Sequence, residues 1–366
     1  MNTLNRRSFL GTVAAGSLAA GCRSPQGVGG AAALAPPPQG KRARLATVCQ
    51  VGRMRKSVAE TLPLVMELCD RALAQKPDLV CLPENFATAS MGKAPPRERA
   101  EAFDGPTLTA VAQRAQQHRC YIVCPVMRLE GGRLFNSAVL FDRAGQVLGL
   151  YNKACPVTTS ADYTSFEDGV TPGTPDIPVF DLDFGRVGIQ ICYDLGFPEN
   201  WDLLRRKGAQ LVLWPSAYDG GTPLWSYAYL HHYYILTSVR GGQSRLVDPC
   251  GAVLAETQPN DGVIVREVNL DYLVAHLDWN RSIPDKIKAQ YGDRVDVRRP
   301  NLGSSHFLVE PVDPALTVRA LQQEFGFEST FQYHERHRVA WAALRAGRQP
   351  QPQTALHGRR PQWGAF

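Results

Sequence analysis

Three side chains of complementary chemistry are spread along the chain: Glu84, Lys153 and Cys192. Each follows directly after a segment whose apolar pattern predicts a β-strand. A carboxylate can take the proton of a thiol, a thiolate can attack a carbonyl carbon, and an ammonium can stabilise the oxyanion that forms. Open α/β sheets gather their catalytic groups at strand ends, so these residues predict one site for nucleophilic attack on a carbonyl group.

Each of the three residues has a simpler explanation when it is taken alone. Glu84 fits an acid at the start of a helix, and Lys153 fits a surface cation. Cys192 fits a buried packing residue, because free cysteine is among the most buried residue types. The chemical interpretation therefore depends on the three residues occurring together.

The segment around Cys192 predicts a sharp corner between a strand and a helix. Val187, Ile189 and Ile191 alternate along residues 186–192 and predict a strand that ends at Cys192. Gly196 and Pro198 then predict a turn, and residues 198–207 predict a helix. A cysteine at such a corner points out of the sheet, near backbone N–H groups that favour a thiolate.

The elements that would position these residues indicate a large α/β domain. Residues 44–51, 57–75 and 78–83 predict a strand-helix-strand unit with parallel pairing. Further strands are expected over residues 121–128, 135–142, 146–152, 179–183, 210–215, 235–239, 244–249 and 263–268, with helices over 106–118, 198–207 and 224–233. The long loop over residues 154–178 has no apolar periodicity, and loops of that length are usually functional.

The composition excludes several classes of protein. Hydrophobic residues make up 44% and charged residues 20% of the 366 residues, which is typical of a globular chain and not of a disordered or membrane-spanning one. The net charge of +6 is modest, and no basic patch is interleaved with aromatic residues, so we expect no nucleic-acid partner. We expect no metal and no cofactor, because no pair of cysteines is completed by histidines at zinc-site spacing. The nine cysteines suggest no disulfide framework, although one or two bridges remain open.

The first 40 residues are expected to be a targeting segment and a tether. Residues 6–10 (RRSFL) and the short apolar stretch after them resemble a twin-arginine export signal. The stretch that ends at Cys22 also resembles a lipoprotein signal, in which that cysteine is lipidated, and cleavage near residues 33–35 is the alternative. Residues 24–40 are rich in Gly, Ala and Pro and predict a tether. We therefore expect a protein that is exported to the periplasm or cell envelope, with a possible lipid anchor at the membrane surface.

Three segments resemble the nitrilase superfamily of carbon-nitrogen hydrolases, in the family's order and spacing. They are LVCLPENF around Glu84, GLYNKACP around Lys153 and VGIQICYDLGFPE around Cys192. A fourth segment, GGQSRLVDPCGAVLAET, resembles the family's closing strand pair, so the likeness spans about residues 42–270. The resemblance implies an α/β fold of the nitrilase type, a four-layer α-β-β-α sandwich. The predicted division is then a hydrolase domain over residues 41–280 and a C-terminal extension over residues 281–366.

The resemblance also implies roles for the site residues. Glu84 would be the general base, Cys192 the nucleophile, and Lys153 an oxyanion donor beside the backbone N–H of Tyr193. Glu167 matches a second family glutamate that orients the lysine or the attacking water, with Asp162 and Asp168 as alternatives. Three residues that follow a nearby strand are candidates to line the substrate pocket or to pack in the core: Trp214, Ser216 and Tyr218.

The implied reaction is hydrolysis of an amide or carbamoyl compound through a cysteine thioester, with release of ammonia or an amine. Tyr193 and Asp194 after the nucleophile resemble the amidase and carbamoylase branches of the superfamily. Nitrile hydrolysis and acyl transfer remain alternatives on the same three residues. A non-catalytic binding module is a further alternative, and so is a papain-like enzyme that uses His231 or His232. The expected partners are a small amide substrate and a second copy of the chain, as a homodimer or larger homo-oligomer.

Overall fold

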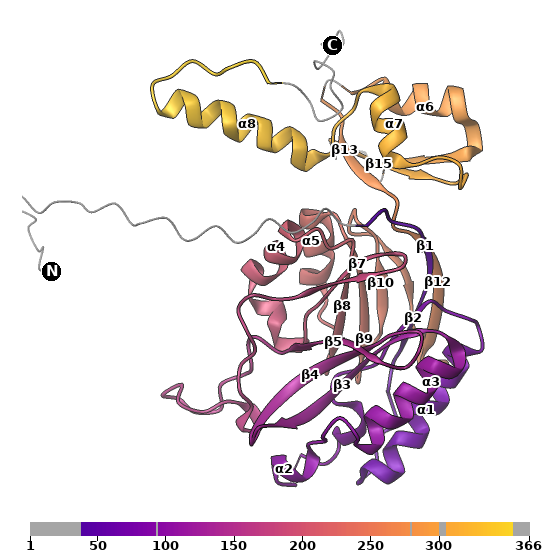
Figure 1. The fold of residues 1–366 in the computed structure, drawn as a ribbon, viewed down its shortest axis with the longest axis vertical. Helices are drawn as coiled ribbons and strands as arrows, with labels where there is room; N and C mark the ends of the chain where they lie inside the picture. The colour runs from indigo at the N-terminus through magenta and orange to yellow at the C-terminus, as the bar shows by residue number, and fades with distance from the viewer. Residues whose placement is uncertain (1–37, 93, 279, 300–304, 354–366) are drawn as a thin grey trace, which may run out of the picture. The chain divides into compact units, whose positions relative to one another are not determined.

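The computed structural model describes residues 38–92, 94–278, 280–299 and 305–353. Two six-stranded β-sheets and the helices that cover them make up most of this part of the chain (Figure 1). The predicted signal segment, including Cys22, and almost all of the predicted tether lie outside the described residues. No helix within the described ranges is long and apolar enough to cross a bilayer.

The first sheet combines parallel strands with two hairpins. Its strands, in spatial order, are β12 (Val263–Asn269), β1 (Arg42–Val48), β2 (Leu79–Cys81), β3 (Tyr121–Glu130), β4 (Arg133–Phe141) and β5 (Val147–Asn152). Strands β1, β2 and β3 pair in parallel because helices α1 (Val58–Leu73) and α3 (Pro106–His118) carry the chain back between them. Hairpins join β3 to β4 and β4 to β5, so these strands pair in antiparallel.

The second sheet has a similar plan. Its strands, in spatial order, are β11 (Val253–Glu256), β10 (Arg245–Val247), β9 (Tyr234–Val239), β8 (Leu211–Ser216), β7 (Gly185–Ile189) and β6 (Val179–Leu182). Strands β7, β8 and β9 pair in parallel through the connecting helices α4 (Pro198–Arg206) and α5 (Thr222–His231). In both sheets, the parallel strands therefore end on the same edge as their neighbours.

The alternation of side chains along β1 shows how the layers stack. Ala43 and Leu45 belong to an apolar cluster that they share with the second sheet. Ala46 and Val48 belong to a different cluster, formed with the apolar faces of α1 and α3. Helices α4 and α5 pack with the second sheet, away from α1 and α3 (Figure 1). The predicted four-layer α-β-β-α sandwich is confirmed.

Residues after β12 build a smaller sheet with its own core. The sheet has the order β13 (Leu273–His276), β15 (His306–Pro311), β14 (Val295–Arg298), and all its pairs are antiparallel. Helices α6 (Ile283–Tyr291) and α7 (Val318–Phe325) bury Ile287 and Leu321 in this core, and α8 (Thr330–Arg345) follows. The predicted domain boundary after residue 280 falls between β13 and β15, the strand with which β13 pairs.

The chain leaves the second sheet earlier than the sequence pattern predicts. Strand β7 ends at Ile189, and Cys192 instead begins a short 3-10 helix, η3 (Cys192–Gly196). The backbone of Cys192 has a φ of +48°, which no strand residue adopts, so the strand cannot extend to the cysteine. Strand β11 is absent from the strands expected by apolar pattern, because its residues are mostly exposed and do not alternate, but it pairs with β10 in the segment that resembles the family's closing strand pair.

Candidate active site

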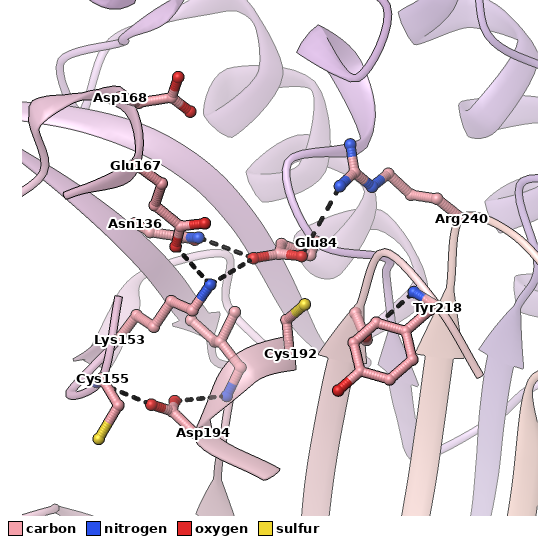
Figure 2. Close-up of polar contacts among 12 residues, drawn as sticks. Glu84, Asn136, Lys153, Cys155, Glu167, Asp168, Cys192, Asp194, Tyr218 and Arg240 are labelled. Carbon is pink, nitrogen blue, oxygen red and sulfur yellow. Dashed lines mark hydrogen bonds and ion pairs between the residues drawn. The ribbon is translucent and has the colours of Figure 1, made fainter. Parts of the chain in front are cut away.

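The strand ends of both sheets meet at one site (Figure 2). Glu84 follows β2 by three residues and Lys153 follows β5 directly, whereas Cys192 comes from the second sheet just after β7. The Lys153 ammonium lies 3.3 Å from Glu84 Oε1, and Cys192 and Glu84 line the same cavity. The structure therefore brings together the three residues that the sequence singled out.

The turn that carries Cys192 is held in a strained conformation by a buried acid. Few non-glycine residues adopt the left-handed backbone of Cys192, and those that do cluster at functional sites. The Asp194 carboxylate accepts the backbone N–H of Ile191 (2.8 Å), the backbone N–H of Cys155 (2.9 Å) and the hydroxyl of Tyr151 (2.7 Å). Because one donor belongs to the cysteine turn and the other two lie at the end of β5 and in the loop after it, Asp194 fixes the turn against that loop.

Asp194 is fully buried, so its carboxylate has lost its contact with water. Burial raises the pKa of Asp194 to about 6, although its hydrogen bonds to Tyr151 and Ile191 act in the opposite direction. The carboxylate is therefore ionised at neutral pH and gains a proton in mildly acidic solution. An ionised carboxylate accepts all three of its hydrogen bonds more strongly than a neutral amide would.

Glu84 is ionised within the site. Burial alone would raise the pKa of this carboxyl group, but the charges of Lys153 and Arg240 and a hydrogen bond from Asn136 together hold the pKa below its usual range. Asn136 Nδ2 donates to Glu84 Oε1 at 2.8 Å, and Arg240 Nη2 lies 3.8 Å from the other oxygen, Oε2. Glu84 therefore offers a charged carboxylate that can accept a proton.

Lys153 is almost completely buried, with 2% of its surface exposed. Burial would lower the pKa of its ammonium, but the negative charges of Glu84 and Glu167 raise the pKa well above its usual value. The Nζ atom donates to Glu167 Oε1 at 2.5 Å as well as to Glu84. Lys153 is therefore a fixed cation between two carboxylates, and removing it would take the ion-pair partner from Glu167 and leave Glu84 with only Arg240 as a cation.

The Cys192 thiol keeps its proton in the unliganded site. Burial, and then the charge of Glu84, raise the pKa of Cys192 to about 12, while Lys153 and hydrogen bonds from Ala217 and Ser216 oppose this rise. The expectation that backbone N–H groups favour the thiolate is therefore outweighed by burial. The thiol needs a base at the moment of attack, and Glu84 is the carboxylate beside it.

A cavity of about 140 Å³ opens beside the cysteine. Its walls are mainly polar, and most of the lining side chains come from the loops that follow the strands. The lining residues are Glu84, Asn85, Thr88, Ala89, Arg99, Met127, Asn136, Glu167, Asp168, Val170, Cys192, Ala217 and Arg240. The nucleophile, the base and Glu167 therefore all reach the same small space.

The three acids considered for the second glutamate have different partners. Glu167 contacts Lys153, as described above. Asp168 forms a two-pronged ion pair with Arg99, which is buried on the short helix α2 (Pro96–Arg99). Asp162 accepts hydrogen bonds from the backbone and hydroxyl of Thr164, within its own loop. Of the three, Glu167 is the acid in contact with Lys153.

The predicted pocket residues lie close to the cysteine, but none of them is among the residues that line the cavity. Trp214 is fully buried, and its indole N–H donates to the carbonyl of Cys192 at 3.2 Å. The Ser216 hydroxyl accepts the backbone N–H of Tyr218 at 3.1 Å and hydrogen-bonds to the cysteine. The half-exposed ring of Tyr218 packs edge-on against Trp214, and the similarly exposed ring of Tyr193 packs against Phe197.

Four residues that hold Glu84 or the cysteine turn in place were not assigned this role from the sequence. Asn136 and Arg240 hold Glu84, and Tyr151 and Asp194 hold the cysteine turn. Asn136 is a polar residue inside the apolar strand β4, and this contrast is the signal in the sequence that could have identified it. Arg240 directly follows strand β9, as Lys153 follows β5, so the rule of strand ends applies to it as well.

The histidines of the papain-like alternative lie elsewhere. His231 stacks on the ring of Tyr227, and His232 is in contact with the carbonyl of Pro249. Burial lowers the pKa of each histidine to about 4, so neither is charged at neutral pH. Neither lines the cavity beside Cys192. In the part of the chain that the structure describes, no group of three or more His, Cys, Asp or Glu residues is arranged to hold a metal ion.

Comparisons with known proteins agree with the geometry of the site. The carbon-nitrogen hydrolase family matches residues 45–276. A deaminated glutathione amidase of Synechocystis sp. is 30% identical over 251 residues, which cover 60% of this chain and 89% of that protein. The omega-amidase NIT2 of Homo sapiens is 26% identical over 222 residues, which cover 55% of this chain and 80% of that protein.

Solved structures show the same fold at lower sequence identity. Nit3 of Saccharomyces cerevisiae, a member of branch 10 of the nitrilase superfamily, aligns with a TM-score of 0.54 at 20% identity and covers 63% of this chain and 90% of its own. An amidase from Nesterenkonia sp. aligns with a TM-score of 0.54 at 22% identity and covers 63% of this chain and 92% of its own. With the matched segment covering more than half of the chain, this protein belongs to the carbon-nitrogen hydrolase family.

Proposed function

We propose that this protein hydrolyses a small amide through a thioester on Cys192. The observation that carries the proposal is that a buried ammonium contacts an ionised carboxylate, and that this carboxylate and a thiol line one cavity of about 140 Å³. The amidases among its relatives support an amide as the substrate in preference to a nitrile.

In the first half of the reaction, Cys192 Sγ attacks the carbonyl carbon of the amide while Glu84 takes the thiol proton. The carbonyl oxygen becomes an oxyanion, which Lys153 Nζ and the backbone N–H of Tyr193 stabilise. The carbon-nitrogen bond then breaks, and Glu84 returns its proton to the departing nitrogen. Ammonia or an amine leaves, and the acyl group remains on the sulfur as a thioester.

In the second half, a water molecule attacks the thioester carbon while Glu84 takes one of its protons. A second oxyanion forms in the same place and collapses, which breaks the carbon-sulfur bond. The Cys192 sulfur regains the proton, and the carboxylic acid product leaves. Glu167 keeps Lys153 in position through both halves, because it binds the same Nζ atom.

A panel of simple amides, carbamoyl compounds and nitriles, scored for ammonia release, tests the proposal. We expect the amides to be hydrolysed and Cys192→Ala to abolish turnover, with an acyl adduct on Cys192 visible by mass spectrometry of the wild type. Cys250→Ala is the matched control, since this cysteine is partly buried away from the cavity. Wild-type rates in Cys192→Ala would reject the mechanism, and release from nitriles alone would reject the amide assignment.

We also propose that the protein acts outside the cytoplasm, as residues 6–10 and Cys22 suggest. Fractionation should recover it in the periplasm or with the membrane, and Cys22→Ala should release any membrane-bound fraction. An uncleaved protein found only in the cytoplasm would refute export. The expected homodimer or larger oligomer is tested by light scattering of the purified protein.

A further inference from the structure

Arg240 places a second cation at the cavity. The residue follows strand β9, and its backbone N–H donates to the carbonyl of Ser216 at 3.0 Å. Its side chain lines the cavity with Cys192, and Figure 2 shows the guanidinium group directed toward Glu84. Only 24% of the side chain is exposed. Arg240 is therefore a largely buried charge that faces the space where a substrate would bind.

Within the described residues, the Arg240 guanidinium makes no hydrogen bond. Glu84 Oε2 lies 3.8 Å from Nη2, which is an ion-pair distance but too long for a hydrogen bond. The Nε atom is shielded from water and has no partner. A guanidinium group has five N–H donors, and leaving such donors buried and unpaired costs free energy. A ligand that supplies acceptors would remove this cost.

Arg99 also lines the cavity, but its guanidinium already has hydrogen-bond partners. Both of its terminal nitrogens donate to the Asp168 carboxylate, and its Nε donates to the carbonyl of Ala94 at 3.2 Å. Arg99 therefore has no need of a further anion. Of the two arginines that line the cavity, Arg240 is the one whose guanidinium is open to a ligand.

Two acceptors in the cavity wall are also unpaired. The amide oxygens of Asn85 and Asn136 are buried and have no hydrogen-bond partner among the described residues. The amide nitrogen of Asn136 is already used on Glu84. Carbonyl oxygens of this kind accept N–H groups, which an amide substrate has at its reacting end. The wall therefore offers acceptors for an amide and, at Arg240, donors for an anion.

We propose that Arg240 binds a carboxylate of the substrate, so that the substrate is a short amide that also carries an acidic group. This inference rests on the proposed amide hydrolysis at Cys192. A guanidinium binds a carboxylate through two parallel N–H bonds, which fixes the orientation of the substrate. The cavity volume of about 140 Å³ is close to the roughly 150 Å³ of an engineered protein cavity that holds benzene, so the chain between the two groups is short.

Binding of the substrate carboxylate would also change the pKa of Glu84, the general base. The charge of Arg240 is one of the groups that lower the pKa of Glu84. A carboxylate bound to Arg240 offsets that charge, so the pKa of Glu84 rises and the carboxylate becomes a stronger base. The base is thereby strengthened when an acidic substrate is bound.

Succinamate and butanamide provide the test, because they have the same four-carbon chain and differ in a carboxylate against a methyl group. We expect the wild type to prefer succinamate by at least about tenfold in kcat/KM, which is the effect of one charged hydrogen bond. Arg240→Gln should remove most of this preference by raising KM for succinamate, and Arg240→Lys should keep part of it. Arg206→Gln, which removes an exposed arginine of α4, should leave the preference unchanged. An unchanged preference in Arg240→Gln would overturn the proposal.

Protection of Cys192 separates this inference from the proposed function, since it needs no turnover. Succinate should slow alkylation of Cys192 by iodoacetamide in the wild type and not in Arg240→Gln. If no amide is hydrolysed but this protection depends on Arg240, amide hydrolysis is rejected and the carboxylate site stands. If succinate protects both proteins equally, or neither, the carboxylate site is rejected whatever the enzyme hydrolyses. Thermal unfolding of each variant verifies that it is folded.

Discussion

Replacing Glu84 with glutamine shows how the Cys192 thiol loses its proton. Burial and the charge of Glu84 raise the pKa of this thiol to about 12. Without assistance, about one such thiol in 10⁵ is ionised at pH 7, compared with about one in thirty for a cysteine with the ordinary pKa near 8.5. An unassisted cysteine at this position would therefore be a poor nucleophile.

The two possible routes to the thiolate predict opposite effects of Glu84→Gln. If the thiol ionises without help, removing the negative charge of Glu84 lowers the pKa of Cys192 and makes the cysteine more reactive. If Glu84 accepts the proton during attack, the variant loses the base, and the rate falls by about 10² to 10⁴. We expect the fall, because Glu84 is ionised and lines the same cavity as the thiol.

The assay is alkylation by iodoacetamide between pH 6 and pH 9, followed cysteine by cysteine through mass spectrometry of peptides. The wild-type rate at Cys192 should be nearly constant, since the pKa of Glu84 lies below its usual range and the base stays ionised across this window. In Glu84→Gln, the rate should rise about tenfold per pH unit, as expected for a thiol far below its pKa. Cys155 is the internal control, because burial and Asp194 raise its pKa to about 11 and its rate should not depend on Glu84.

Two results would refute this reasoning. One is faster alkylation of Cys192 in Glu84→Gln than in the wild type at pH 7. The other is a wild-type rate that climbs tenfold per pH unit, which would mean that the thiolate forms without a base. Cys192→Ala provides the background for both measurements.

Three further changes test the parts around the cysteine. Lys153→Ala should lower kcat for ammonia release by at least about a hundredfold, which corresponds to about 3 kcal/mol for one oxyanion donor, and a loss of less than tenfold would contradict that role. Tyr151→Phe removes one of the three donors to Asp194 and should lower the free energy of unfolding in urea by about 1–3 kcal/mol, so an unchanged value would show that the bond is not needed. Arg99→Met leaves Asp168 unpaired and should speed hydrogen exchange in residues 165–170 by about tenfold, an effect of about 1.4 kcal/mol, whereas unchanged exchange would show that the pair does not hold the loop.

The strand-helix-strand units could be predicted because most strands of the two large sheets carry their own apolar pattern, whereas the four layers were implied by the resemblance to the nitrilase superfamily. Strands β1 and β2 are buried on both faces, and their parallel pairing follows from the helix that connects them. The smaller sheet was not predicted, because β13 pairs with β15, and α6 and β14 lie between these two strands in the chain. Such pairing depends on contacts between distant residues, and no local pattern specifies it.

Within the site, the sequence predicted which residues have reactive groups but not which residues control them. Glu84, Lys153 and Cys192 could be found because each is a reactive type at the end of a strand. The pKa of Cys192 could not be predicted, since it depends on burial and on the distance to Glu84. Asn136 and Arg240 are ordinary in sequence and gain their importance only because the fold places them against the same carboxylate.

The pairing of β13 with β15 limits how this chain could exchange its C-terminal part with a relative. The family match ends at residue 276, so a natural recombination or an engineered swap at that point would keep β13 and replace β15, the strand with which it pairs. A bare strand edge of this kind invites association with other chains. A viable crossover would fall in the short link over residues 270–272, ahead of β13. The C-terminal part is therefore inherited together with the last strand of the matched segment.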